Sequence, residues 1–335
     1  MDEGSKAIET LKKAVGVLRT PEFPPEEVEE WAINRYLEVT EDTNPLWVDN
    51  EYAKKSRWGS VITPPTFVEM FSSLYRQWRR TPAPSTFLTP PFPYNFGAGT
   101  LYEFFVPVRK GDIISATCFL SEVTERRGSS GGRLAIIRYD KEYRNQIGEL
   151  VSRSRLSQVS VEARSHRKAA PATLPPKETD VEPAEKPTGQ VCFEDVEVGD
   201  RIPSLMKTFD VTTLCRWMYT MGFLAPMHYN YDYTTIEAGL PNLIVQGPLS
   251  NSYLARMVNH WIGGWGMLKS LHSDFRGVIL IHIPITFAGR ITDKYVKDGE
   301  NFVELQVWSE HPEGWILTHG KATVTLPARA DVPGR

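Results

Sequence analysis

Residues 44–49 read NPLWVD, and residues 225–230, in the other half of the chain, read APMHYN. A second matched pair follows them, ITPP at residues 62–65 and VQGP at residues 245–248. The two pairs occur in the same order, and each second member leads into an apolar stretch of helical character. The simplest account is an ancient internal duplication, so the chain contains two copies of one structural unit.

Each copy has the same predicted order of elements: a helix, a loop, a long apolar helix and a set of strands. The strand segments alternate apolar with polar residues and are rich in β-branched and aromatic side chains. A long apolar helix and an antiparallel sheet bury their apolar faces only against each other, which predicts an α+β fold. We expect first-copy helices from Pro25 to about Val39 and from Pro65 onward, first-copy strands at 101–108, 112–126, 133–145 and 149–161, and second-copy strands at 273–277, 282–296, 301–310 and 314–326.

Residues 163–189 separate the two copies and differ from them in composition. Prolines recur there among Lys, Glu and Ala, and large apolar side chains are almost absent. Such a segment cannot bury enough surface to offset its chain entropy, and its prolines favour an extended linker outside the sheets. We therefore predict one domain at residues 1–162 and another at residues 190–335, packed together as an internal pseudo-dimer.

The composition narrows the classes of function. Of the 335 residues, 41% are apolar and 24% are charged, as in ordinary globular proteins, and the net charge of -3 gives no general attraction for nucleic acid. No apolar run has membrane-spanning length. Cys118, Cys192 and Cys215 lie far apart, which predicts neither a disulfide framework nor a metal site and fits a reducing cytoplasm.

Several short motifs resemble the MaoC-like (R)-specific enoyl-CoA hydratases and dehydratases, and the first copy resembles the N-terminal dehydratase domain of two-domain members. The resemblance covers nearly the whole chain. It implies a tandem or double hotdog, in which each half wraps a curved antiparallel sheet around a long helix. It also implies an acyl-CoA thioester substrate, with coenzyme A as part of that substrate and no separate cofactor. The motifs include TNPL at 43–46, PPTF at 64–67, EFF at 103–105 and GPL at 247–249.

In such families a loop of the form G-D-x-N-P, then an apolar residue and a histidine, supplies an aspartate and a histidine that activate one water. This chain divides the pair between its halves. The first half keeps the aspartate as Asp42 but has Trp47 at the histidine position. The second half keeps the histidine as His228 but has Phe223 at the aspartate position. We expect the two loops to lie at opposite ends of antiparallel helices, so that Asp42 and His228 do not share a water.

The family resemblance also implies an oxyanion donor, a backbone N–H at the start of the long helix. Gly247 holds that place in the second half, whereas the first half has Pro64, which has no N–H. We therefore place the active cleft in the second half and expect the first-half cleft to suit a bulky acyl chain better than a reaction. The catalytic candidates are His228 and Gly247, with Asp42 also considered, although DTNP is typical of an Asx turn as well.

Five further residues are candidates for contacting substrate. Asn230 is expected to orient water or substrate beside His228, and Tyr219, Tyr229 or Asp232 to replace the missing carboxylate. Asn44, Trp47 and Phe223 are added because they stand at positions of the family motif. The five candidates for binding substrate are Asn230, Tyr219, Asn44, Trp47 and Phe223.

The leading functional hypothesis is a lyase that interconverts 2-enoyl and 3-hydroxyacyl thioesters. Two alternatives stay open: a non-catalytic acyl-CoA-binding subunit whose partner carries an intact Asp/His pair, and a thioesterase or other reaction on the same scaffold. Hotdog sheets often associate further, so a homo-oligomer is expected, and a hetero-oligomer with another hotdog subunit is the alternative.

Overall fold

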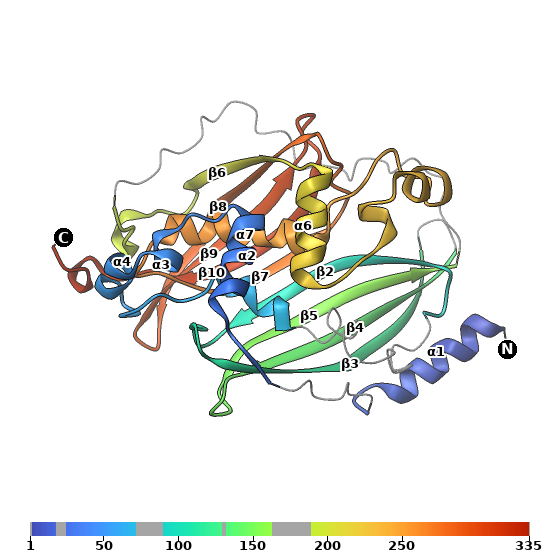
Figure 1. The fold of residues 1–335 in the computed structure, drawn as a ribbon, viewed down its shortest axis with the longest axis horizontal. Coiled ribbons are helices and arrows are strands. Elements are labelled where there is room, and N and C mark those ends of the chain that lie inside the picture. Colours follow the sequence, from blue (N-terminus) through green and yellow to red (C-terminus); the bar gives the residue numbers. More distant parts are fainter. Residues whose placement is uncertain (1, 18–24, 72–89, 129–131, 163–188, 335) are drawn as a thin grey trace.

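The structure is a computed structural model that describes residues 2–17, 25–71, 90–128, 132–162 and 189–334. Among these residues, ten strands form one sheet in the order β1-β3-β4-β5-β2-β7-β10-β9-β8-β6 (Figure 1). Every neighbouring pair is antiparallel. The strands are β1 (Glu26–Glu27), β2 (Tyr94–Phe104), β3 (Ile113–Arg127), β4 (Arg133–Arg144), β5 (Leu150–Val161), β6 (Arg201–Thr208), β7 (Met267–Phe275), β8 (Pro284–Lys297), β9 (Glu300–Glu310) and β10 (Ile316–Thr325).

The two copies meet where β2 pairs with β7, in a register that runs from Gly99 opposite Asp274 to Glu103 opposite Ser270. Gly99 is required at this seam. A Cβ atom there would lie 2.3 Å from the carbonyl oxygen of Ser273, closer than any side chain can be accommodated. The sheets of the two halves are therefore joined by main-chain hydrogen bonds, as predicted for an internal pseudo-dimer.

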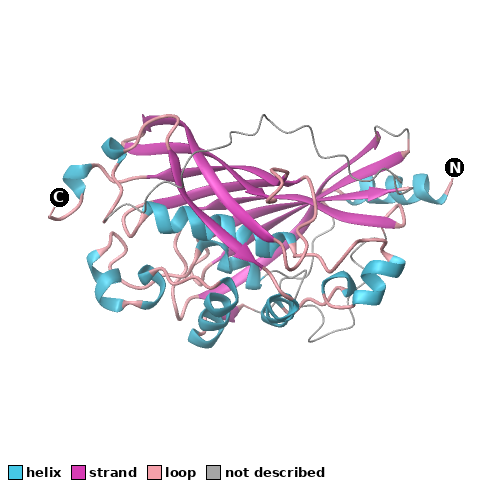
Figure 2. Ribbon diagram, turned by 90° about the horizontal axis from the view of Figure 1, so that it is seen from above, coloured by secondary structure: helices cyan, strands magenta, loops and turns pink. Residues whose placement is uncertain are grey.

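Helices cover one face of this sheet (Figure 2). Helix α1 lies apart from them, beside the first-half strand β3 (Figure 1). The central helix α7 begins with Gly247-Pro248, where a proline costs no intrahelical hydrogen bond, and ends at Ile262, followed by Gly263 with φ of 66°. Most of its residues are buried. The helices are α1 (Glu3–Ala14), α2 (Glu30–Thr40), α3 (Pro45–Val48), α4 (Asn50–Lys55), α6 (Val211–Met221) and α7 (Gly247–Ile262), with short turns η1 (Pro65–Phe71), η3 (Phe193–Asp195), η4 (Pro226–His228), η5 (Tyr233–Glu237) and η6 (Arg329–Asp331).

One hydrophobic core serves both halves. It joins Tyr36 and Phe67 of the first copy to Tyr253 and Phe287 of the second without a break. A smaller cluster lies apart from it, where Ile8 and Leu11 of α1 pack against β3 and β4. Within this core, α7 packs on the second-half strands and also contacts α2, η1 and β2 of the first half.

Several expected elements differ from the structure. The segment from Pro65 to Phe71 forms a 3-10 helix, and the remainder of the expected long helix lies outside the described residues. The proposed linker also lies outside them, up to residue 188. The strand expected at 273–277 is β7, which begins at Met267, and β2 begins seven residues before 101. Gly99 in β2 and Ser270 in β7 lower the strand propensity of the seam, where pairing between the copies decides the structure.

Candidate active site

A cavity of about 300 Å³ lies at the N-terminal end of α7. Its second-half wall is largely apolar and includes Trp217 and Met221 of α6, Phe223, and Phe275 of β7. The first half closes another side with Phe96 of β2 and the neighbouring strand β5. Because both copies contribute, the cavity exists only in the paired arrangement. A space of this volume and character is typical of a small-molecule site.

His228 lines this cavity and has a defined tautomer. It ends the short turn η4, its side chain is buried, and Nδ1 lies 2.8 Å from the carbonyl oxygen of Ile244. A carbonyl only accepts, so Nδ1 carries the hydrogen and Nε2 of the neutral ring keeps a lone pair. The Ile244 carbonyl is itself held in place, since Ile244 pairs with Leu280 in a β-bridge. Burial lowers the pKa of His228, and the hydrogen bond to Ile244 opposes that shift only in part.

Gly247 lines the same cavity as the first residue of α7. The first N–H groups of a helix have no intrahelical acceptor, and the helix dipole makes them good donors to a developing negative charge. A side chain is excluded at this position. A Cβ atom would lie 2.5 Å from Cε2 and Cζ of Phe275. The glycine thus lets an aromatic side chain close over the start of the helix.

Two residues that the sequence reasoning overlooked stand beside Gly247. Gln246 and Ser250 line the cavity, and both side chains are buried. Neither the Gln246 amide nor the Ser250 hydroxyl has a hydrogen-bond partner among the residues that the structure describes. Buried polar groups are usually paired, so unpaired ones at a cavity are candidates for contacting a ligand. In the sequence, their position next to the Gly247-Pro248 dipeptide at the helix start was the feature that could have identified them.

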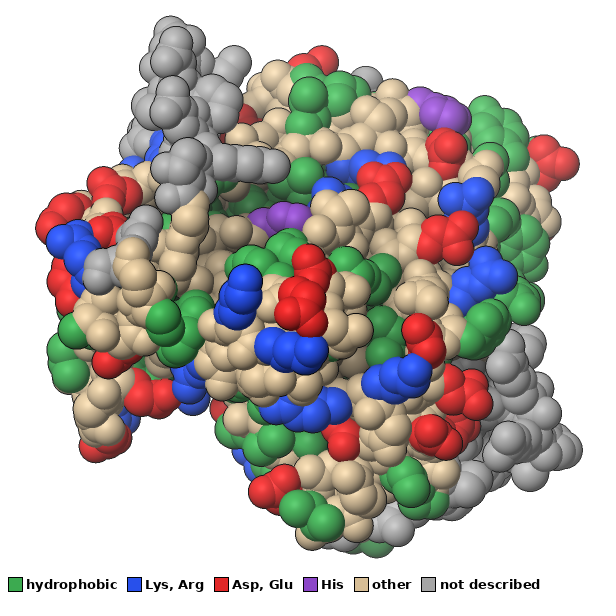
Figure 3. Space-filling view, turned by 60° about the vertical axis from the view of Figure 1, so that its left-hand side comes forward, with side chains coloured by type: hydrophobic (Ala, Val, Ile, Leu, Met, Phe, Trp, Pro, Cys, Tyr) green, Lys and Arg blue, Asp and Glu red, His purple; other side chains and the backbone are tan. Residues whose placement is uncertain are grey.

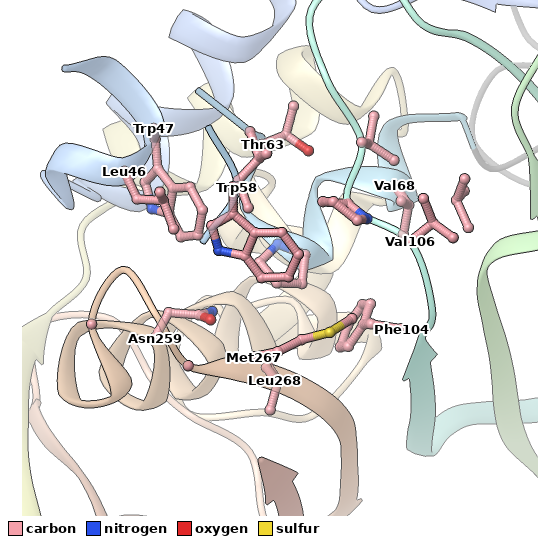
Figure 4. Close-up of a pocket in the computed structure, with 17 residues that line it drawn as sticks. Leu46, Trp47, Trp58, Thr63, Val68, Phe104, Val106, Asn259, Met267 and Leu268 are labelled. Atoms are coloured by element: carbon pink, nitrogen blue, oxygen red, sulfur yellow. The ribbon is translucent and has the colours of Figure 1, made fainter. Parts of the chain in front are cut away.

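In the first half, the cleft that corresponds to the His228 cavity is almost closed. The cavity there is about 40 Å³, room for roughly three water molecules. Trp47 and Trp58 occupy it, and Asn259 and Met267 of the second half approach from the opposite side (Figure 4). The two indole rings line a space far smaller than a bulky acyl chain, so the structure does not support the expectation that this cleft houses one.

Asp42 lies at the other end of α7 from His228. Its Oδ1 is 2.7 Å from Nε2 of His260, in the last turn of the helix, and also accepts from the backbone N–H of Asn44. Asn44 in turn caps α3 and donates to the carbonyl of Asn259. Gly247 and His260 are thirteen residues apart, about 20 Å along a helix. The structure therefore brings His228 and Gly247 together and places Asp42 elsewhere.

Of the remaining candidates, Phe223 lines the cavity and Trp47 fills the first-half cleft. Tyr219 of α6 is 60% exposed and does not line the cavity. Asn230 is exposed as well, and its side-chain oxygen accepts from the backbone N–H of Tyr233. The suggested stand-ins for the missing carboxylate, Tyr229 and Asp232, are also exposed and outside the cavity lining.

Other site types find no support in the part of the chain that is described. Within it, no group of three or more His, Cys, Asp or Glu residues is placed to hold a metal ion. No helix of the described ranges combines the length and hydropathy needed to cross a membrane. Acidic and basic side chains are intermixed on the face drawn in Figure 3.

Comparison with known proteins agrees with the geometry. Residues 15–154 match the family model of the FAS1-like dehydratase domain region, and no curated protein matches the sequence. A MaoC-like dehydratase of known structure is 20% identical with a TM-score of 0.72, over 95% of this chain and 99% of that one. A conserved hypothetical protein from Mycobacterium tuberculosis with a double hotdog fold is 9% identical with a TM-score of 0.58, over 91% and 95%.

The chain has the MaoC-like double-hotdog fold. A MaoC-like dehydratase from Phytophthora capsici is 13% identical, with a TM-score of 0.58 over 95% of this chain and 98% of that one. The expected family resemblance and the tandem hotdog fold are thus confirmed. The solved structures show the fold, and the family model extends the likeness of the first half to a dehydratase domain region. A fold of this kind does not by itself determine the chemistry of its site.

Proposed function

We propose that this MaoC-like double hotdog is a lyase that interconverts 2-enoyl and 3-hydroxyacyl thioesters in the second-half cavity. The observation that carries the proposal is that His228 and Gly247, the first residue of α7, both line one largely apolar cavity. Water addition to an enoyl thioester needs a base for the water and a donor for the thioester oxygen. The cavity offers one group for each task.

The geometry suggests how these groups share the work. The thioester carbonyl would accept from the Gly247 N–H, where the helix dipole stabilises negative charge that develops on oxygen. His228, neutral because burial lowers its pKa, would accept a proton from water through Nε2. The apolar wall with Trp217, Met221 and Phe223 would enclose an apolar acyl group and exclude bulk water. Coenzyme A would enter only as part of the substrate.

The test uses the purified chain and a panel of straight, branched and aromatic enoyl-CoA esters, with loss of the conjugated thioester absorbance as the signal. We expect turnover by the wild type and a loss of about 100-fold or more in His228→Ala, the usual contribution of a general base. The matched control is His260→Ala, at the far end of α7, which should retain turnover. Equal activity of wild type and His228→Ala would contradict the proposal.

A second candidate function is an acyl-thioester-binding subunit that works with a catalytic hotdog partner. One observation favours it: Phe223 stands where the family motif has its aspartate, and it lines the cavity. In that case the chain alone would bind enoyl-CoA esters without consuming them. Binding measured by calorimetry, together with turnover only after a partner is added, would distinguish it from the lyase. Release of free thiol from saturated acyl-CoA esters would instead indicate a thioesterase.

A further inference from the structure

The polar groups of the second-half cavity are almost all neutral. Asn95, Gln158, Gln246, Ser250 and Thr318 contribute amides and hydroxyls. Among the described residues that line the cavity, His228 is the one whose side chain gains or loses a proton in the ordinary pH range. An acid–base reaction in this space therefore has one titrating group available from the described chain.

Charged groups on the neighbouring elements are engaged elsewhere. Asp274 precedes Phe275 in β7, so it points to the opposite face of the strand, and it pairs with Arg276 at 3.3 Å and with His272 at 3.6 Å. On α6, Arg216 pairs with Glu38, and Tyr219 is exposed, as are Tyr229 and Asp232 beyond η4. Burial and the Ile244 carbonyl are the influences that set the pKa of His228.

We infer that His228 alone serves as both base and acid within one turnover, so that this site works without the aspartate of the family pair. The inference rests on the proposed lyase function. In hydration, Nε2 removes a proton from water as the water oxygen bonds to C3. The C2–C3 π electrons move to form an enolate, whose oxygen accepts from Gly247. The same Nε2 then delivers its proton to C2, the carbonyl re-forms, and the sum is addition of one H₂O.

Dehydration reverses each step. Neutral Nε2 removes the proton from C2, the enolate forms, and the imidazolium protonates the C3 hydroxyl as the C3–O bond breaks and water leaves. Both directions therefore begin with neutral His228. In a site with two titrating groups, one must start protonated and the other deprotonated, which gives a bell-shaped pH dependence.

The pH dependence of kcat/KM tests this directly. We expect a single acid limb, with its midpoint below the ordinary histidine value of 6.5, followed by a plateau to alkaline pH in both directions. A bell-shaped profile in the wild type would overturn the inference while leaving the lyase proposal standing. Absence of turnover with every ester would instead defeat the lyase proposal itself.

Two variants sharpen the test. Phe223→Asp restores a carboxylate at the motif position, and we expect it to add a second ionisation to the pH profile. The matched control Phe223→Asn adds a polar group that does not titrate, so its profile should keep a single acid limb. His228→Ala should abolish both water addition and exchange of the C2 proton of a 3-hydroxyacyl-CoA ester into D₂O, followed by NMR. Exchange at the wild-type rate in His228→Ala would reveal a second base and overturn the inference.

Discussion

The side chain of His228 is buried as a neutral ring, and this makes folding depend on pH. In the unfolded chain the ring takes up a proton near its ordinary pKa of 6.5, whereas in the folded protein burial lowers that pKa. As the pH falls through 6.5 toward the folded value, the unfolded chain binds more protons than the folded one. The free energy of unfolding therefore decreases over that window and is unaffected by this group above it.

We expect the melting temperature to fall between pH 7 and pH 5 and to fall less in His228→Gln, in which the titrating ring is absent. Thermal unfolding of the two proteins across this range measures the difference. Because the two proteins share every other side chain, the difference between the two curves belongs to His228. Parallel curves would show that burial does not shift this group.

Gly247 gives a second expectation at the scale of one residue. Gly247→Ala places a methyl group 2.5 Å from the Phe275 ring, so the ring or the helix start must move. Overpacking of this kind costs about 1–3 kcal/mol. We expect a lower melting temperature and a loss of turnover, with part of both restored in the double variant Gly247→Ala/Phe275→Leu. No recovery in the double variant would mean that the Phe275 contact is not the cause.

At the scale of elements, α7 carries a different function at each end. Its N-terminus borders the 300 Å³ cavity, and its last turn holds His260 against Asp42 of the first half. Asp42 is thus a contact between the two copies. The loop DTNP supplies it because Asn44 caps α3 and turns the chain toward α7.

We expect Asp42→Ala to destabilise the protein by about 1–3 kcal/mol, the usual cost of leaving a buried donor such as the Asn44 N–H unpaired, and to change turnover little. Asp42→Asn keeps an acceptor for His260 and for the Asn44 N–H and should be milder. Urea unfolding and enoyl-CoA turnover of the same samples separate the two effects. A loss of activity equal to that of His228→Ala, and not additive with it, would instead place Asp42 in the reaction.

A buried ion pair ties η1 to the first-half sheet. Lys141 Nζ lies 3.0 Å from Glu69 Oε2, with side chains 3% and 5% exposed, and Ser154 donates to the same carboxylate. Removing one partner leaves an uncompensated buried charge, so we expect Lys141→Met to cost about 3–5 kcal/mol. The double variant Glu69→Leu/Lys141→Met should be much closer to wild type, as chemical denaturation can show. An equal cost in single and double variants would argue against a coupled pair.

At the scale of the whole molecule, the shared core and the β2–β7 seam predict one unfolding transition. Neither half can lose its sheet without exposing the edge strand and core residues of the other. We expect a single calorimetric peak whose calorimetric and van't Hoff enthalpies agree. Two separate peaks would show that the copies unfold independently and that the seam contributes little.

Much of this organisation was predictable from the chain alone. The matched segments at 44–49 and 225–230, and at 62–65 and 245–248, located both loops and the start of α7, and the motif position of His228 predicted a residue that lines the second-half cavity. The seam was not predictable in detail, because Gly99 and Ser270 have low strand propensity and pair only once the two copies meet. Gln246 and Ser250 escaped attention because a buried amide or hydroxyl is informative only when its lack of partners is known.

The permanent β2–β7 seam also affects how such a protein can change over generations. In a dimer of identical subunits, one gene encodes both sites, so a tryptophan that replaced the histidine in one would replace it in the other. Here the two copies lie on one chain and accumulate substitutions independently. Trp47 can therefore occupy one cleft while the other copy retains its histidine.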